Sequence, residues 1–259
     1  MKVFLVLDET PFYHPNFIAR FLEKTKDEIV GVGIVRKIPK RSNLELYLAT
    51  HFYFLKVNEI LKLLYKRCLY FLKDHFVKKK REGDFYSTES VIKFFNLSYF
   101  YIKYSINKEE YLDKIRKTQP DVIVSSNTLI FGKDILRIPR ACCINIHSAL
   151  LPAYGGLWPV LQAYRNKEEY VGVSVHVMKR RIDQGMVLSQ IKIKIEDGDT
   201  IATLYEKCFE KSADVMFVAL EKIAKSDISP LTNDFKPSYY SFPTKKHWTE
   251  FRKMGGRFI

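Results

Sequence analysis

ACCINIHSALLP, residues 141–152, joins an apolar run to an asparagine and a histidine. Residues 141–146 predict a buried strand. Side chains alternate across a strand, so Asn145 and His147 project to the same side near its carboxyl end. Open α/β sheets bind their ligands at that end of the strands, and this stretch therefore predicts both the fold and the place of its site.

A carboxylate completes the candidate site. Asp183 follows on a loop between two further strand-like runs, residues 171–178 and 186–195. An amide N–H and an imidazolium can hold the oxyanion of a tetrahedral intermediate while a carboxylate handles the proton of the nucleophile. The three residues suit acyl or formyl transfer, and this chemistry needs no metal ion.

Three motifs within residues 119–220 resemble one known family. In chain order they are Asn145-x-His147-x-x-Leu150-Leu151-Pro152, Tyr154-x-Gly156-x-x-Pro159 and Asp183-x-Gly185. They are similar to those of the folate-dependent formyltransferases, which include glycinamide ribonucleotide transformylase, methionyl-tRNA formyltransferase, formyltetrahydrofolate hydrolase and the sugar N-formyltransferases. Ser148 and Ala149 replace the Pro and Ser of the commonest family form, and neither position carries the chemistry.

The resemblance implies that Asn145, His147 and Asp183 are catalytic and that N10-formyltetrahydrofolate is the formyl donor. Taken singly, each residue also fits a structural role, as a turn cap, a core imidazole or a loop carboxylate. Their order and spacing favour the catalytic role. His176 alternates with Ser174 and Met178 on a strand. It either holds Asp183 or a water of the folate site in place or lines the pocket passively.

The same resemblance implies where the folate binds. Residues 126–131 form the loop that wraps the pterin in the family, and the backbone of this loop would hydrogen-bond the ring. The candidate donor-binding residues, besides Asp183, are Ser126, Thr128, Ile130, Phe131, Leu136, Cys143 and Met178. For the apolar members, an ordinary place in the core is an equal alternative.

Strand-like and helix-like segments alternate along the chain: a strand at residues 2–7, a helix at 16–24 and a strand at 29–35. We therefore expect an α/β, Rossmann-like fold with a mostly parallel sheet and helices on both faces. Residues 1–225 form the expected catalytic domain, and residues 226–259 a short C-terminal appendage. The opening lacks the glycine-rich dinucleotide fingerprint, and residues 8–15 are interpreted as a loop. His14 on this loop is a candidate acceptor contact, with a structural role as the alternative.

Residues 44–82 form an insertion that the resemblance does not reach. Apolar residues at three- and four-residue spacing predict one or two amphipathic helices there. The expected buried stripe consists of Leu55, Ile60, Leu61, Leu64, Leu69 and Leu72. Packing against the sheet or against the second subunit of a homodimer is the favoured interpretation, and reversible contact with a membrane surface is the alternative.

Composition limits the class of protein. The chain has 259 residues, of which 47% are hydrophobic, and this is enough for a sizeable core. Its four cysteines show no Cys-x-x-Cys metal spacing, and the sequence shows no signal peptide or bilayer-spanning run. These features predict reduced thiols and a cytoplasmic location. The net charge of +14 is spread over the chain apart from Lys78-Lys79-Lys80-Arg81, so nucleic acid is not expected as the main partner.

The expected function is transfer of the formyl group to a primary amine of a small molecule. The Gly156 turn and His176 resemble the sugar N-formyltransferases most, so the leading acceptor is a phosphorylated small molecule, in the first place a nucleotide-linked amino sugar. Acceptor candidates are His14, Tyr154, Gly156, Trp158 and His176, with Trp158 the preferred stacking residue. A tail of about thirty-five residues is too short for the barrel domain of a methionyl-tRNA formyltransferase. The alternatives are an enzyme like that one, a formyltetrahydrofolate hydrolase and, in another class, an inactive folate-binding protein.

Overall fold

The computed structural model describes residues 1–10, 13–36, 54–77, 80 and 83–259. Its centre is a seven-stranded sheet in the order β3-β2-β1-β4-β5-β7-β8. These strands are β1 (Lys2–Asp8), β2 (Glu28–Val35), β3 (Tyr99–Ile102), β4 (Val122–Ser126), β5 (Cys142–His147), β7 (Tyr170–Val177) and β8 (Val187–Lys194). The first five run parallel, whereas β7 is antiparallel to β5 and to β8. The predicted Rossmann-like, mostly parallel sheet is confirmed.

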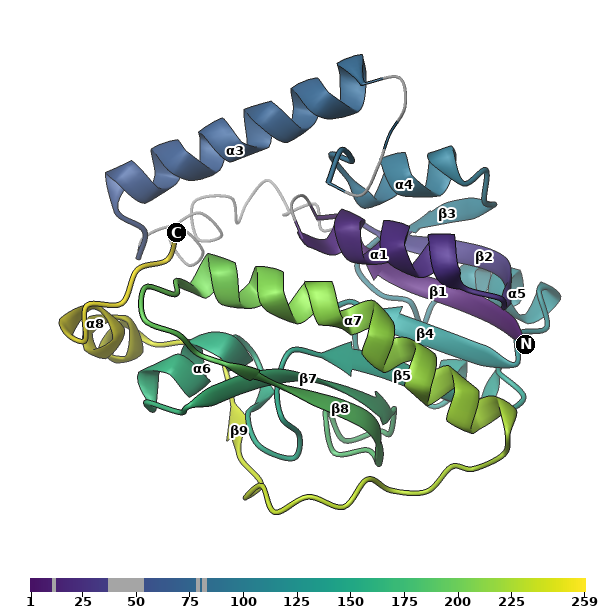
Figure 1. The fold of residues 1–259 in the computed structure, drawn as a ribbon. Helices are drawn as coiled ribbons and strands as arrows, with labels where there is room; N and C mark the ends of the chain where they lie inside the picture. The colour runs from purple at the N-terminus through teal and green to yellow at the C-terminus, as the bar shows by residue number, and fades with distance from the viewer. Residues whose placement is uncertain (11–12, 37–53, 78–79, 81–82) are drawn as a thin grey trace.

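Both faces of the sheet are buried because apolar residues follow one another along its central strands. In β1, Val3 and Leu5 belong to the larger core, and Phe4 and Val6 to the smaller core on the opposite face. The larger core is covered by α1 (Tyr13–Lys24), α4 (Thr88–Phe94), α6 (Pro159–Arg165) and α7 (Ile201–Ala224). Helix α5 (Glu109–Lys117) and the short helix η2 (Ile135–Arg137) cover the smaller one (Figure 1).

The C-terminal segment folds back onto the domain. Its strand β9 (Tyr239–Tyr240) pairs in parallel with β6 (Gly155–Gly156), in a two-stranded sheet. Helix α8 (Lys245–Lys253) follows, and its Trp248 and Phe251 are buried in the larger core. Residues 226–259, expected as an appendage, therefore share the core of the main domain.

Helix α3 (Val57–Phe76) differs from the prediction made for the insertion. The prediction of a buried leucine stripe is wrong: Leu61, Leu64, Leu69 and Leu72 are exposed, and Leu55 and Ile60 are only half-buried. The helix turns its polar side toward the domain, so its apolar side faces outward. Residues 44–53, 78–79 and 81–82 of the insertion, with most of the predicted basic cluster, lie outside the described residues. Among the described helices, none is long and apolar enough to cross a bilayer.

Candidate active site

The four polar side chains singled out in the sequence meet at the end of β5. The antiparallel register places Asn145 of β5 opposite His176 of β7, with Asn145 Nδ2 3.4 Å from His176 Nε2. Asp183, on the loop between β7 and β8, lies with Oδ1 3.5 Å from His176 Nε2 and with Oδ2 3.8 Å from His147 Nε2. Residues that are 38 positions apart in the chain, Asn145 and Asp183, are therefore joined through one imidazole.

One polar atom of the Asn145 side chain is left without a hydrogen-bond partner among the described residues. The side chain is buried, and the open atom is Oδ1. The Nδ1 of His176 lies 3.1 Å from the Val177 carbonyl, which can only accept, so Nδ1 donates, and Nε2 faces both the Asn145 amide and the Asp183 carboxylate. Exchanging the O and N of the amide would still leave one polar atom open. A buried amide with an open edge is suited to a ligand.

The Asp183 carboxylate is stabilised as an anion. Burial acts to raise its pKa, but the hydrogen bond to His176, the charge of His147 and the Gly156 N–H outweigh burial and lower the pKa to about 2. The Gly156 N–H donates to Oδ2 at 2.8 Å. Asp183 adopts a φ of 53°, in the left-handed region, where strain often marks functional positions. Two residues on, a Cβ at Gly185 would lie 1.5 Å from the Val177 carbonyl oxygen, which explains the Asp183-x-Gly185 motif.

His147 is neutral before any ligand arrives. Burial lowers the pKa of the imidazole below its ordinary value, and the nearby Asp183 charge offsets this only in part. Its Nε2 lies 3.1 Å from the Tyr154 carbonyl, so Nε2 carries the proton and donates it to that oxygen. The imidazolium expected from the sequence is therefore not the resting form, although the neutral ring is already a hydrogen-bond donor.

The C-terminal strand holds the turn that contacts two of the three catalytic candidates, His147 and Asp183. Gly155 N donates to Ser238 O at 3.0 Å, and Leu157 N donates to Tyr240 O at 2.8 Å. Ser238 Oγ also accepts from the Tyr154 N–H at 2.8 Å. The Tyr154 and Tyr240 rings stack with centroids 5.6 Å apart. Because the same turn presents the Tyr154 carbonyl to His147 and the Gly156 N–H to Asp183, β9 sets the position of both.

Sequence reasoning missed Ser238 and Tyr240 as positioning residues. The aromatic pair at residues 239–240 is visible in the sequence, but no local pattern relates it to the turn at Gly156. The turn itself is strained: Tyr154 and Trp158 have φ values of 59° and 57°, and Gly156 has a φ of 93°. A Cβ at Gly156 would lie 2.0 Å from the Tyr240 carbonyl oxygen, so glycine lets β9 approach.

Comparison with known proteins agrees with this geometry. Residues 73–220, more than half of the chain, match the family model for formyl transferases. The chain belongs to the formyl transferase family. It is 39% identical over 144 residues to the bifunctional polymyxin resistance protein ArnA of Wigglesworthia glossinidia brevipalpis, an alignment that covers 54% of this chain and 22% of that protein. It is 35% identical over 143 residues to the methionyl-tRNA formyltransferase of Thermotoga maritima, covering 55% and 46%. The chain thus aligns with less than half the length of either relative.

Solved formyltransferases share the fold. A sugar N-formyltransferase from Shewanella sp. superposes with a TM-score of 0.56 at 19% identity, covering 93% of this chain and 76% of that one. The phosphoribosylglycinamide formyltransferase of Bacillus halodurans gives 0.58 at 17% identity, covering 86% and 95%. At these identities the likeness concerns the fold alone.

The residues expected from the sequence to bind a donor lie at the end of β4, on the loop that follows it and in the smaller core. Phe131, Leu136, Cys143 and Met178 belong to one apolar cluster, in the smaller core. Ser126 ends β4 and is buried. Thr128 and Ile130 stand at the exposed part of the loop, with Ile130 64% exposed. Asn127 shapes the loop, because its Oδ1 accepts from the Leu129 N–H at 2.7 Å.

Two acceptor candidates lie where the sequence did not place them. His14 is not on a loop: α1 begins at Tyr13, and His14 is buried in the first turn, with Nε2 2.8 Å from Ser126 Oγ and Nδ1 3.3 Å from Thr88 Oγ1. Trp158 packs edge-on against the rings of Phe54 and Trp248, with centroids 5.6 and 5.5 Å away. The indole is thus part of an aromatic cluster with the tail.

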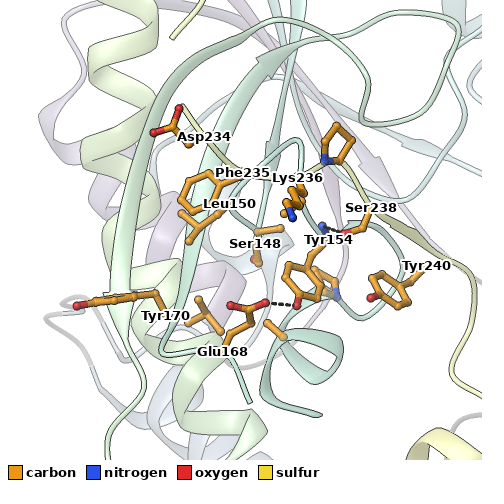
Figure 2. A pocket seen from close by; sticks show the side chains of 16 residues that line it. Ser148, Leu150, Tyr154, Glu168, Tyr170, Asp234, Phe235, Lys236, Ser238 and Tyr240 are labelled. Carbon is orange, nitrogen blue, oxygen red and sulfur yellow. Dashed lines mark hydrogen bonds between the residues drawn. The ribbon is translucent and has the colours of Figure 1, made fainter. Parts of the chain in front are cut away.

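A cavity of about 380 Å³ opens behind the Tyr154 turn (Figure 2). Its walls come from residues 148–154, from the start of β7 and from residues 234–240 of the tail. Tyr154 points its ring into this cavity and donates its hydroxyl to Glu168 Oε1 at 2.5 Å, while its carbonyl faces His147. Asn145, His147 and Asp183 are not lining residues, so this cavity is distinct from the catalytic candidates.

Proposed function

We propose that this formyl transferase family member moves the formyl group of N10-formyltetrahydrofolate to a primary amine. The observation that carries the proposal is the meeting of Asn145, His147 and Asp183 around His176, all within 4 Å of a neighbour in the group. A formyl donor fits the residues present. The Asn145 side-chain NH2 has two N–H donors, and the one that is not directed at His176 can donate to a carbonyl oxygen. The apolar cluster of Phe131, Leu136, Cys143 and Met178 offers walls for a flat ring.

The donor supplies an activated formyl carbon, and the protein supplies position, hydrogen bonds and proton transfer. Asn145 donates from its amide toward the formyl oxygen, where negative charge develops when the amine attacks. Asp183, ionised at neutral pH, attracts the positive charge that develops on the attacking nitrogen and assists its deprotonation directly or through a water. His147, neutral at rest, can take up this proton and pass it to the departing folate nitrogen, since Asp183 favours the charged imidazole.

His176 positions the other groups. It contacts both Asn145 and Asp183 through Nε2, and its Nδ1–H is fixed by the Val177 carbonyl. A ring held in this way determines the orientation of the amide and of the carboxylate. We assign it a positioning role, in place of a passive one in the wall of the pocket.

We further propose that the acceptor is a nucleotide-linked amino sugar. The Gly156 turn and His176 support this choice, and the net charge of +14 suits a diphosphate. A structural neighbour with a TM-score of 0.58 is a sugar 3N-formyl transferase, studied in the presence of dTDP and 5-N-formyl-THF. The four cysteines are free thiols, which supports a reducing compartment such as the cytoplasm.

Turnover assays separate the candidate functions. The protein is incubated with N10-formyltetrahydrofolate alone, with a panel of nucleotide amino sugars and with charged methionyl-tRNA. We expect release of tetrahydrofolate that depends on a nucleotide amino sugar and is lost in Asp183→Asn. Release without any amine would identify a hydrolase, and formylation of methionyl-tRNA alone would identify the tRNA enzyme. Folate binding without release would leave a binding protein and contradict the proposal.

A further inference from the structure

Helix α3 is attached to the domain through its polar side. Glu59 is buried and forms an ion pair with Arg252 at 2.5 Å, and it also accepts from the Phe258 N–H at 2.8 Å. Lys66 lies 3.6 Å from Glu206. Asp74 pairs with Lys80. Both acidic residues of the helix are therefore paired with a cation, and Glu59 faces the domain.

The outer side of α3 is apolar. Val57, Leu61, Tyr65 and Phe76 are 74%, 61%, 67% and 70% exposed. At 3.6 residues per turn, they fall in one arc of about 160° together with the other large exposed apolar side chains of the helix. Those others are Leu64, Leu69, Phe71 and Leu72. We call this surface the outer face of α3.

The outer face is unusual for a surface of a water-soluble domain. Single exposed apolar residues are common, but a contiguous set of eight marks an interaction site. Figure 1 shows α3 at the periphery of the molecule, and it meets α7 on its inner side through Lys66 and Glu206. Its outer face can therefore meet a broad, flat partner along the whole helix.

The charged residues that border the outer face of α3 favour one kind of partner. Lys62 and Lys73 border the outer face on one side and Arg67 on the other, all three exposed. Glu59 points inward to Arg252, and Asp74, which follows Arg67 by two turns on the same side, is half-buried and neutralised by Lys80. Two copies joined through this face would bring basic borders together, in chains that each carry a net charge of +14. An anionic surface would complement the same borders.

We propose that the outer face of α3 binds the surface of an anionic lipid bilayer. The leucine and aromatic side chains enter the boundary between head groups and acyl chains, and the lysines and Arg67 contact lipid phosphates. This mode needs no spanning helix, and a 20-residue helix presents about 30 Å of length to the surface. The proposal is independent of the formyl-transfer chemistry, since α3 contains none of the candidate site residues.

Cosedimentation with vesicles tests the proposal. We expect the full chain to bind vesicles of equal parts phosphatidylcholine and phosphatidylglycerol, and not vesicles of phosphatidylcholine alone. Lys62→Ala and Lys73→Ala should each weaken binding about fivefold. The double variant Leu61→Glu/Leu64→Glu should abolish it. Val218→Glu is the matched control, because Val218 is 48% exposed on α7 and its replacement should leave binding unchanged. Circular dichroism checks that each variant is folded.

Cys68 provides a second readout, in the middle of the outer face. It is exposed, whereas Cys143 and Cys208 are buried and burial raises the pKa of Cys142 to about 11. A polarity-sensitive dye on Cys68 should shift its emission to the blue when anionic vesicles are added. Vesicle binding without this shift, or no binding by a folded protein, would overturn the proposal. So would a concentration-dependent shift in the absence of lipid, with dimers in analytical ultracentrifugation, because a second copy would then occupy the face.

Discussion

At the scale of single residues, Asn145 combines burial with an open polar edge, and this combination makes its role testable. We predict that Asn145→Ala lowers kcat by about a hundred- to a thousandfold, the loss typical of one oxyanion donor. The fold should persist, because alanine has no polar side-chain atom that would be buried without a hydrogen-bond partner. Asn58→Ala, at an exposed position of α3, is the control. Steady-state kinetics with retained kcat in Asn145→Ala would remove the amide from the mechanism.

The lowered pKa of His147 predicts how stability depends on pH. In the unfolded chain the imidazole titrates near its ordinary value of 6.5, and in the folded protein it titrates lower because it is buried. As pH falls below 6.5, the unfolded state therefore binds more protons, and the free energy of unfolding decreases by at most about 1.4 kcal/mol per pH unit from this group. Urea titrations from pH 7.5 to 5 should show this loss in the native chain. His147→Asn should reduce the slope, and an unchanged slope would contradict the assignment.

At the scale of elements, the pairing of β6 with β9 predicts a role in catalysis for the C-terminal strand. Gly156→Ala places a Cβ 2.0 Å from the Tyr240 carbonyl and should displace β9, lowering kcat more than tenfold. Gly198→Ala is a matched control, because Gly198 has a similar φ of 90° but nothing within 4 Å of its Cβ. Both variants carry the cost of an alanine at positive φ, about 1 kcal/mol or more. Equal kcat in the two variants would show that β9 does not position His147 and Asp183.

The elements also show what the sequence could predict. The strands and the caps of α7 and α8 follow local rules: Thr200 accepts from the Thr203 N–H and Thr244 from the His247 N–H, each as an N-cap. The amphipathic pattern of α3 predicts how wide its apolar face is, but not whether that face points toward the domain or away from it. That direction depends on a distant pair, Glu59 with Arg252, which no local pattern reveals. Two-residue strands such as β6 and β9 are likewise too short to recognise before their long-range pairing is known.

At the scale of the whole molecule, ligand binding should be visible as stability. A reduced folate bound only by the native protein should raise Tm, by mass action equivalent to about 2.7 kcal/mol at a concentration one hundred times Kd. NAD and ATP should leave Tm unchanged, since the sequence carries no glycine-rich phosphate fingerprint. Thermal scans with each ligand measure the effect. A shift with NAD and none with folate would contradict the proposed donor.

The overall architecture and the meeting of Asn145, His147 and Asp183 both follow from the sequence, because buried strands and ordered motifs constrain where each strand ends. The contacts that hold the site residues in place cannot be predicted from the sequence in this way. Ser238 reaches Tyr154 across 84 positions of the chain, and His14 proved to be buried against Ser126 instead of lying on an open loop. Such contacts depend on how the C-terminal segment and α1 close over the sheet.

The turn between β5 and α6 positions His147 and Asp183 by hydrogen bonds from main-chain atoms, a carbonyl oxygen and an amide hydrogen. Its side chains are thereby released from the task of orienting the chemistry. Side chains such as that of Leu157, which is exposed, can be exchanged without loss of these main-chain hydrogen bonds. Related proteins with this arrangement can change side chains around the site to accept new molecules while they keep the same reaction centre. Changes of substrate and conservation of the catalytic geometry therefore involve different atoms.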